Sequence, residues 1–268
     1  MKKLSKKVSD PNLNNVTILG ATGMLGRACK LEFPEAYSPS REQFDALIDE
    51  VNFSDWVINC IGAIPQKVKD TETMWKLNAD FPKKIAAKAK VIQIATDCVF
   101  SGQKGNYTEI STPDPIDEYG KSKSAGESAL SMKIRCSIIG PEESNASLFE
   151  WVRQQPENAT INGYADHFWN GVTTNIFAKL AKGIIETNSW RNSTFHFVPK
   201  DSVSKYELVR FIAERTGRRD LKIIKYATGL PVDRTLATIY PKENEKFWDL
   251  AGYAQIPTIE QIVHEMPI

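Results

Sequence analysis

The feature that most constrains the fold is a set of three glycines, spaced three residues apart, near the start of the chain. Gly20, Gly23 and Gly26 follow the apolar run at residues 16–19 and precede residues 27–31, which we expect to be helical. The first glycine permits a tight turn, the second lets backbone amides approach a phosphate, and the third lets the helix lie against the strand. The helix N-terminus then offers unpaired N–H groups to a pyrophosphate. The segment therefore predicts a dinucleotide-binding turn, with a glycine-rich turn that holds no ligand as the alternative.

Further short apolar segments predict the other strands of a parallel sheet. They occupy residues 35–38, 54–63, 91–95 and 133–140. In a doubly wound sheet, ligands bind in the crevice outside the carboxyl ends of the strands. We therefore predict an α/β fold with a Rossmann-like doubly wound parallel sheet.

The end of the predicted second strand bears on the choice of cofactor. An Asp or Glu that binds the ribose of NAD is expected about 20 residues beyond the first glycine. This chain has Ser38 and Arg41 there, followed by Glu42. Hydroxyls and a guanidinium suit a 2′-phosphate, which favours NADPH and leaves NADH as the alternative. Arg41 could equally be a plain surface charge. The expected cofactor-binding residues are Gly20, Thr22, Gly23, Met24, Leu25, Gly26, Ser38, Arg41, Cys60, Ile61, Gly62, Tyr119 and Lys123.

Three polar residues form a candidate catalytic set. Thr96 follows the strand at residues 91–95, so its hydroxyl faces the ligand crevice. Tyr119 and Lys123 are four residues apart and share one face of a helix. We expect the ammonium to lower the phenol pKa from its ordinary value of about 10. Thr96 would donate a hydrogen bond to a substrate carbonyl, and Tyr119 would donate a proton to the oxygen of that carbonyl. Lys123 would also donate a hydrogen bond to the nicotinamide ribose.

Several ordered motifs resemble one known family. The glycine spacing is similar to that of the extended short-chain dehydrogenases/reductases. Residues 95–102, 107–109 and 119–127 resemble the dTDP-4-dehydrorhamnose reductase branch of that family. The resemblance, which runs from about Val16 to Gly140, implies NAD(P)H-dependent reduction of the 4-keto group of a nucleotide-linked deoxysugar in the synthesis of cell-envelope polysaccharide precursors. Where the rhamnose enzymes usually carry Tyr, this chain has Cys98, which leaves the sugar open.

The resemblance also implies how the chain is divided and where substrate binds. It places a smaller C-terminal substrate-binding α/β region after the dinucleotide domain. We expect a flexible tail at residues 1–15, a cofactor domain at 16–141 plus about 172–200, and substrate-binding segments at 142–171 and about 201–268. Arg234 is a candidate clamp for the substrate pyrophosphate, with a surface salt bridge as the equal alternative. The expected substrate-binding residues are Asp97, Cys98, Val99, Phe100, Trp169, Asn170 and Arg234.

Two other functions use the same residues. A sugar-nucleotide epimerase would recycle tightly bound NAD, whereas dehydratases usually carry an Asp-Glu pair where this chain has Asp97 and Cys98. A reductase-like fold can also serve as a non-catalytic, NADP-binding regulatory subunit of another enzyme. A complete set of Thr96, Tyr119 and Lys123 argues against that reading, since a binding module needs none of them for chemistry.

Charge and composition restrict the partners. With 34 basic and 33 acidic residues the net charge is +1, which gives no field that favours nucleic acid or an anionic membrane. We find no signal sequence and no apolar run long enough to span a bilayer, so we expect a cytoplasmic protein. The four cysteines are scattered and the three histidines lack ligand spacing, which predicts free thiols and no metal. A homodimer is compatible with the sequence, which does not settle the oligomeric state.

Overall fold

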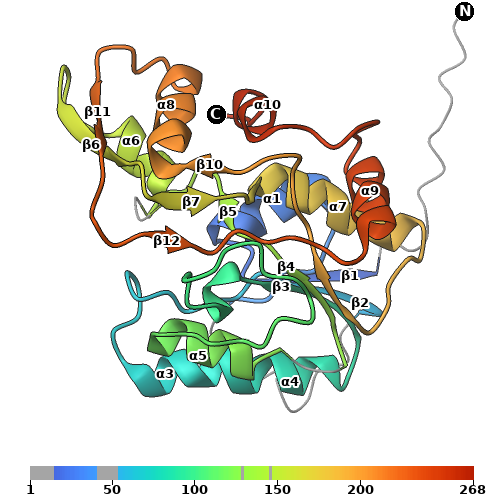
Figure 1. Ribbon diagram of the computed structural model, residues 1–268. Coiled ribbons are helices and arrows are strands. Elements are labelled where there is room, and N and C mark those ends of the chain that lie inside the picture. Colours follow the sequence, from blue (N-terminus) through green and yellow to red (C-terminus); the bar gives the residue numbers. More distant parts are fainter. Residues whose placement is uncertain (1–14, 41–53, 128–129, 145–146) are drawn as a thin grey trace, which may run out of the picture.

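A computed structural model describes residues 15–40, 54–127, 130–144 and 147–268 of the chain. At its centre lies a five-stranded sheet in the order β1-β2-β3-β4-β9, and every neighbouring pair is parallel (Figure 1). Nearly every residue of the first strands is buried, because helices cover both faces of the sheet. The strands are β1 (Val16–Leu19), β2 (Trp56–Asn59), β3 (Lys90–Ala95), β4 (Met132–Arg135) and β9 (Thr194–His196).

The strand order reverses at β1. Tyr37 bridges Thr17 on one side of β1, whereas β2 pairs with it on the other side. The strand predicted at residues 35–38 is therefore a single bridge, held by the Ile18 N–H, which donates to the Tyr37 carbonyl at 2.8 Å. Pro39 ends the pairing because it has no N–H to donate. Such a reversal opens a crevice at the carboxyl end of β1, where the glycine turn begins.

Helices lie on both faces of the sheet (Figure 1). One face carries α1 (Met24–Glu32) and α7 (Thr174–Glu186), which pack against each other. The other face carries α3 (Thr71–Trp75), α4 (Phe81–Ala86) and α5 (Glu118–Ala125). Five large apolar side chains of α7 are buried, as expected for a helix that lies on the sheet: Ile176, Phe177, Leu180, Ile184 and Ile185.

A π-helical turn, Lys76–Asp80, separates α3 from α4. Pro82 cannot donate a hydrogen bond to Asn78, and its ring would meet that carbonyl in a regular α-helix. The Phe81 N–H instead donates to the Lys76 carbonyl. The Asn78 carbonyl then faces Gly126, where an added Cβ would lie 1.8 Å from its oxygen. The interruption therefore lets α5 approach this helix closely.

The remaining elements form small sheets and helices beyond the main sheet (Figure 1). Three short strands join in the order β10-β7-β12, two join as β11-β6, and β5 pairs with β8. The predicted division into two domains stays a prediction. The elements are β5 (Ile138–Ile139), α6 (Leu148–Arg153), β6 (Thr160–Tyr164), β7 (His167–Trp169), β8 (Val172–Thr173), β10 (Val203–Ser204), α8 (Lys205–Arg215), β11 (Lys222–Tyr226), β12 (Val232–Asp233), α9 (Pro241–Leu250) and α10 (Ile259–His264).

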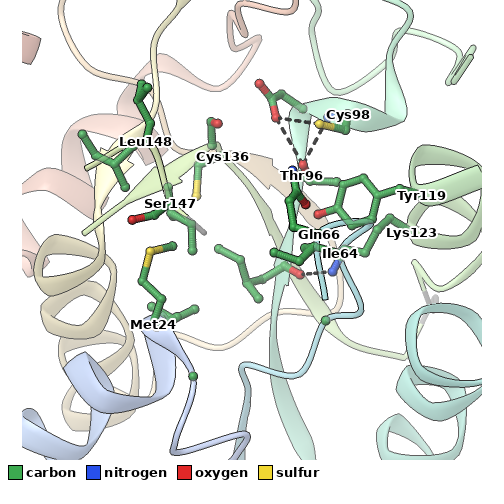
Figure 2. Close-up of a pocket in the computed structure, with 18 of the residues that line it drawn as sticks. Met24, Ile64, Gln66, Thr96, Cys98, Tyr119, Lys123, Cys136, Ser147 and Leu148 are labelled. Atoms are coloured by element: carbon green, nitrogen blue, oxygen red, sulfur yellow. Dashed lines mark hydrogen bonds between the residues drawn. The ribbon is translucent and has the colours of Figure 1, made fainter. Parts of the chain in front are cut away.

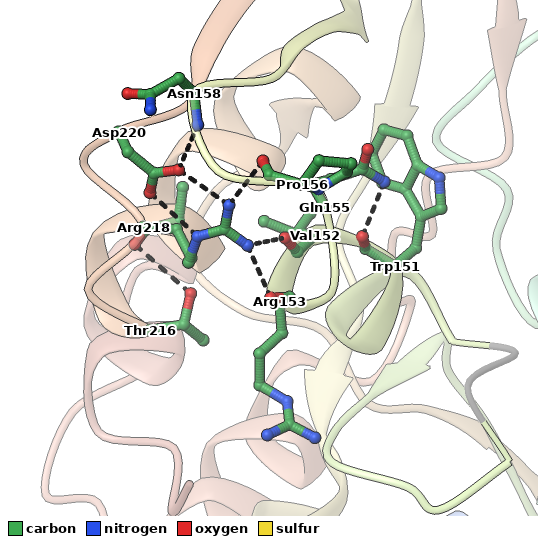
Figure 3. Close-up of polar contacts among 10 residues, drawn as sticks. Trp151, Val152, Arg153, Gln155, Pro156, Asn158, Thr216, Arg218 and Asp220 are labelled. Atoms are coloured by element: carbon green, nitrogen blue, oxygen red, sulfur yellow. Dashed lines mark hydrogen bonds and ion pairs between the residues drawn. The ribbon is translucent and has the colours of Figure 1, made fainter.

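Arg218 ties the end of α6 to the loop that follows α8 (Figure 3). Its guanidinium donates to the carbonyls of Arg153 at 2.7 Å and Pro156 at 3.1 Å. It also donates to both carboxylate oxygens of Asp220, each at 2.9 Å. Asp220 in turn accepts a hydrogen bond from the Asn158 N–H. The cluster satisfies carbonyls at the C-terminal end of α6 and so fixes the orientation of that helix.

Candidate active site

A cleft of about 490 Å³ lies at the carboxyl ends of β1, β2 and β3 (Figure 2). The start of α1, the loop after β2, the end of β3 and the face of α5 form its walls. Most predicted cofactor residues line it, together with the proposed catalytic residues and two residues of the outer elements. These are Gly23, Met24, Leu25, Cys60, Ile61, Gly62, Thr96, Asp97, Cys98, Tyr119, Lys123, Trp169 and Lys205.

The glycine turn lies beneath this cleft and has the predicted geometry. Gly20 has a φ of +78°, a left-handed conformation that only glycine adopts without strain. An added Cβ on Gly26 would lie 2.0 Å from the Gly20 carbonyl oxygen, so the helix could not lie so close to the turn. Gly23 makes no side-chain cap and the first turn of α1 has no acidic residue. The free N–H groups at the start of α1 therefore suit an anionic ligand, such as the pyrophosphate of a dinucleotide.

Replacement of Gly26 by alanine should displace this turn. We expect the free energy of unfolding to fall by roughly 1–3 kcal/mol, because the new methyl group meets backbone atoms that cannot rotate away. The affinity for a nicotinamide dinucleotide should fall at least about tenfold, since an anion-binding turn needs its amides in place. Urea unfolding and ligand titration measure the two effects. Gly62→Ala is the stability control, because its Cβ would lie no closer than 3.9 Å to another side chain. Wild-type affinity in Gly26→Ala would contradict the role of this turn.

Two of the other predicted cofactor residues lie outside the cleft wall. Thr22 is in the turn, where its carbonyl accepts a hydrogen bond from the Arg27 side chain at 2.9 Å. Ser38 is half-buried, and its hydroxyl lies 3.4 Å from the Ala36 carbonyl. Arg41 falls outside the described residues, so its proposed contact with a 2′-phosphate stays a prediction.

Thr96, Tyr119 and Lys123 lie together on one side of the cleft (Figure 2). The Thr96 hydroxyl follows β3 directly and accepts a hydrogen bond from the Cys98 N–H at 3.2 Å. The Lys123 ammonium donates to the Ile94 carbonyl at 3.3 Å, so α5 is attached to the end of the same strand. The predicted set is therefore brought together by two neighbouring elements.

Two contacts bring α5 close to the strand end. The helix is capped by Asp117, whose carboxylate accepts a hydrogen bond from the Gly120 N–H at 2.7 Å. An added Cβ on Gly120 would lie 2.2 Å from the Cys98 carbonyl oxygen, so only glycine allows this approach. The residue directly after Tyr119 must therefore be glycine for α5 to lie this close to the end of β3.

The electrostatics differ from the prediction. Burial raises the pKa of Tyr119 above its ordinary value, and the charge of a Cys98 thiolate or of Asp97 would raise it further, whereas hydrogen bonding to Thr96 lowers it. Burial also lowers the pKa of Lys123, against the attraction of Glu127. The prediction that Lys123 lowers the phenol pKa is thus wrong for this arrangement, because desolvation is the largest cause and raises that pKa. The phenol remains a proton donor at neutral pH.

The side chain of Asn78 connects the loop after β2 to α5. Its side-chain amide donates to the Ala63 carbonyl at 2.9 Å and to the Ser122 hydroxyl at 3.1 Å, and its oxygen accepts from the Ala63 N–H at 2.8 Å. The side chain is only 2% exposed. Asn78 therefore holds the loop after β2 against α5.

The predicted substrate residues divide into two groups. Asp97, Cys98 and Trp169 line the cleft. Val99 and Phe100 instead pack in a separate apolar cluster, where Phe100 stacks on Tyr107 with ring centroids 4.3 Å apart. Asn170 makes two hydrogen bonds to the backbone of Leu236, and Arg234 donates to the Phe100 carbonyl at 3.0 Å. These four are absent from the described cleft wall: Val99, Phe100, Asn170 and Arg234.

A second cavity, of about 760 Å³, adjoins the first and was missed from the sequence. We call it the outer groove. Three residues line both cavities: Ser147, Leu148 and Lys205. No motif marks these residues, and the only local signal at Lys205 is the capping box of Ser204 and Glu207 that starts α8. The rest of the outer groove is lined by Trp151, Thr160, Ile161, Asn162, Tyr164, His167 and Val209.

The four cysteines are free thiols, as predicted. The Cys60 and Cys29 sulfurs lie 3.8 Å apart beside the cleft. Burial and the charge of Asp97 raise the pKa of Cys98 to about 12, so it is a neutral thiol at physiological pH. Within the described ranges, we find neither a group of three potential metal ligands nor a helix able to span a membrane.

Residues 14–234 match the family model of the RmlD substrate binding domain. The chain belongs to this family. Among its relatives is methionine adenosyltransferase 2 subunit beta of Danio rerio, which is 30% identical over 74% of this chain and 73% of that protein. The dTDP-4-dehydrorhamnose reductase of Aggregatibacter actinomycetemcomitans is 24% identical over 71% of this chain and 75% of the reductase.

Solved structures of a dTDP-4-dehydrorhamnose reductase and of a dTDP-glucose 4,6-dehydratase share the fold. The crystal structure of dTDP-4-dehydrorhamnose reductase from Bacillus anthracis in complex with NADP has a TM-score of 0.75 and 21% sequence identity, covering 94% of this chain and 97% of that one. A dTDP-glucose 4,6-dehydratase from Streptomyces venezuelae has a TM-score of 0.68 and 13% identity, covering 94% and 95% of the two chains. The predicted Rossmann-like α/β fold and the resemblance to rhamnose reductases are thus confirmed.

Proposed function

We propose that the protein reduces the 4-keto group of a nucleoside-diphosphate deoxysugar with NADPH. The observation that carries this proposal is the convergence of Thr96, Tyr119 and Lys123 in one cleft with the uncapped start of α1. The reductases among the relatives support it. We place the reaction in the cytoplasm, in the synthesis of cell-envelope polysaccharide precursors.

A nicotinamide dinucleotide fits the residues present. The glycine turn and the free N–H groups at the start of α1 would hold its pyrophosphate. Gly62 leaves room beside Lys123, since even an added Cβ would lie 3.9 Å from the ammonium nitrogen. A neighbouring structure is a complex with NADP and another contains NAD, so both cofactors remain candidates. We infer NADPH as the preferred one from Ser38 and Arg41.

The side chains of the cleft have separate tasks in this reaction. The nicotinamide, when bound, supplies a hydride to the sugar carbonyl carbon. Thr96 donates a hydrogen bond to the carbonyl oxygen, and Tyr119 gives its phenolic proton to that oxygen as it becomes a hydroxyl. Lys123 donates to the cofactor ribose, which orients the ring. The raised pKa of Tyr119 keeps its proton available for this step.

The nucleoside of the substrate would occupy the outer groove. This groove continues from the cleft through shared residues, so one ligand can extend into both. Trp151, Tyr164 and His167 give it aromatic walls suited to a flat base. Tyr164 and His167 already lie with ring centroids 5.0 Å apart.

A panel of 4-keto sugar nucleotides with NADPH and NADH tests the proposal, followed by absorbance of the reduced nicotinamide. We expect stoichiometric consumption of NADPH with at least one substrate. Turnover of a sugar nucleotide without such consumption would identify an epimerase with bound NAD and overturn the reductase assignment.

A second candidate function follows from the relative in Danio rerio, which is a subunit of methionine adenosyltransferase 2. On this reading the chain is a dinucleotide-binding regulatory subunit of another enzyme. The two functions separate in one pair of measurements: reductase turnover, and co-sedimentation with a catalytic methionine adenosyltransferase chain. Binding to that chain, with no turnover of any 4-keto sugar nucleotide, would favour the subunit.

A further inference from the structure

Lys205 stands at the junction of the two cavities. It is the first residue of α8, and its side chain lines both the cleft and the outer groove. The ammonium nitrogen lies 5.6 Å from the centroid of the Trp169 ring, which forms part of the cleft wall. A ligand that extends from one cavity into the other must therefore pass this charge.

The ammonium of Lys205 has no hydrogen bond or salt bridge within the part of the chain that the structure describes. The carboxylate of Asp97 attracts it, but that carboxylate accepts hydrogen bonds from the Thr96 hydroxyl and the Cys98 thiol. Cys98 itself is neutral, and Arg234 adds a second positive charge nearby. Burial lowers the pKa of Lys205 and the charge of Asp97 opposes this, so an anion placed beside the ammonium would be attracted to it.

Arg234, the residue predicted to clamp the substrate pyrophosphate, lines neither cavity. Its guanidinium donates to the Phe100 carbonyl at 3.0 Å and lies within 4.0 Å of the Cys98 sulfur, behind the cleft wall. The side chain predicted as an anion clamp is thus hydrogen-bonded to backbone. Lys205, which no sequence motif marks, has no hydrogen bond or ion pair within the described residues. Lysine is a suitable point charge for phosphate, since it needs no bidentate geometry.

We propose that Lys205 binds the diphosphate of the nucleotide-linked substrate and so connects the nucleoside in the outer groove to the sugar beside Thr96 and Tyr119. This assignment rests on the proposed function. It makes Lys205 a substrate-binding residue with no part in proton transfer. Its contribution should appear only with ligands that carry the diphosphate of the substrate, and not with the cofactor.

The test compares nucleoside diphosphates with the matching nucleosides by calorimetry, for the thymidine, uridine and guanosine series. With the best base, we expect the wild-type chain to bind the diphosphate about 10–100-fold more tightly than the nucleoside, as one charge-assisted contact predicts. Lys205→Met should remove this advantage and leave nucleoside and NADPH affinities unchanged. Lys205→Arg should keep most of it. Lys222→Met is the matched control, because Lys222 is exposed on β11 and lines neither cavity.

Each other outcome overturns the inference in a recognisable way. Equal diphosphate affinity in wild type and Lys205→Met refutes Lys205 as the contact but leaves the proposed function standing. Loss of nucleoside and NADPH binding in Lys205→Met would mark a structural role. A selective loss in Arg234→Met, with Lys205→Met unchanged, returns the role to Arg234. A wild-type chain that binds none of these nucleotides refutes both the inference and the proposed substrate class.

Discussion

Tyr119→Phe should lower kcat for 4-keto reduction by about 10²–10⁴-fold, which is the usual contribution of a positioned general acid. The substitution removes only the hydroxyl, so the ring still fills its place between α5 and the end of β3. Affinity for NADPH should stay within about twofold, because the cofactor is held mainly by the glycine turn and Lys123. Stopped-flow absorbance of the nicotinamide measures the first quantity, and fluorescence titration measures the second.

Tyr240→Phe is the matched control for this loss. Tyr240 is 43% exposed and lies outside the cleft wall, so its hydroxyl has no contact with the proposed substrate. Unchanged turnover in Tyr119→Phe would remove the phenol from the mechanism. A variant that binds neither substrate nor NADPH would instead show that the phenol is structural.

The pH dependence of turnover follows from the direction of the Tyr119 pKa. Because burial raises that pKa above its ordinary value of about 10, the phenol stays protonated through the neutral and mildly alkaline range. Reduction uses the protonated form, so kcat should not fall between about pH 7 and 9 through loss of this proton. A pH–rate profile with saturating substrate checks this. A fall of kcat between about pH 7 and 9 that is absent from the residual activity of Tyr119→Phe would show that the bound complex lowers the phenol pKa.

The parts predicted correctly are those that local sequence determines. The glycine turn requires its glycines because of backbone contacts within a few residues, and a strand end places Thr96 without help from distant segments. Tyr119 and Lys123 share a helix face by periodicity alone. The order of these motifs along the chain was therefore sufficient to predict the parallel sheet and to bring Thr96, Tyr119 and Lys123 to one cleft, whereas their catalytic role stays a prediction.

The parts that were wrong or missed depend on contacts between distant residues. Arg234 was expected to meet the substrate, but the Phe100 carbonyl, 134 residues earlier in the chain, binds its guanidinium. Lys205 becomes a cleft residue only because α8 packs beside β7 and α6, which no local pattern reveals. The pKa of Tyr119 likewise depends on burial, which cannot be predicted from a Tyr-x-x-x-Lys spacing. The direction of a side chain and its desolvation both depend on the tertiary structure, so local sequence does not determine them.

Loss of the Glu127 carboxylate should destabilise the fold more than any other single change discussed for this chain. Both carboxylate oxygens accept hydrogen bonds from Arg135, at 2.8 and 2.6 Å, and the two side chains are only 11% and 6% exposed. Glu127 follows the end of α5, whereas Arg135 ends β4 beside Ala95. The pair therefore attaches the helix of Tyr119 and Lys123 to the strands that present Thr96.

Glu127→Ala leaves the Arg135 guanidinium buried without its carboxylate, which should lower the free energy of unfolding by about 3–5 kcal/mol. Urea unfolding followed by tryptophan fluorescence measures this. Glu127→Ala combined with Arg135→Met should recover most of the loss, because neither charge then remains buried. Glu118→Ala on the same helix is the control, since its ion pair with Lys121 is about half exposed and should contribute little. A double variant as unstable as Glu127→Ala would mean that packing, and not an uncompensated charge, sets the cost.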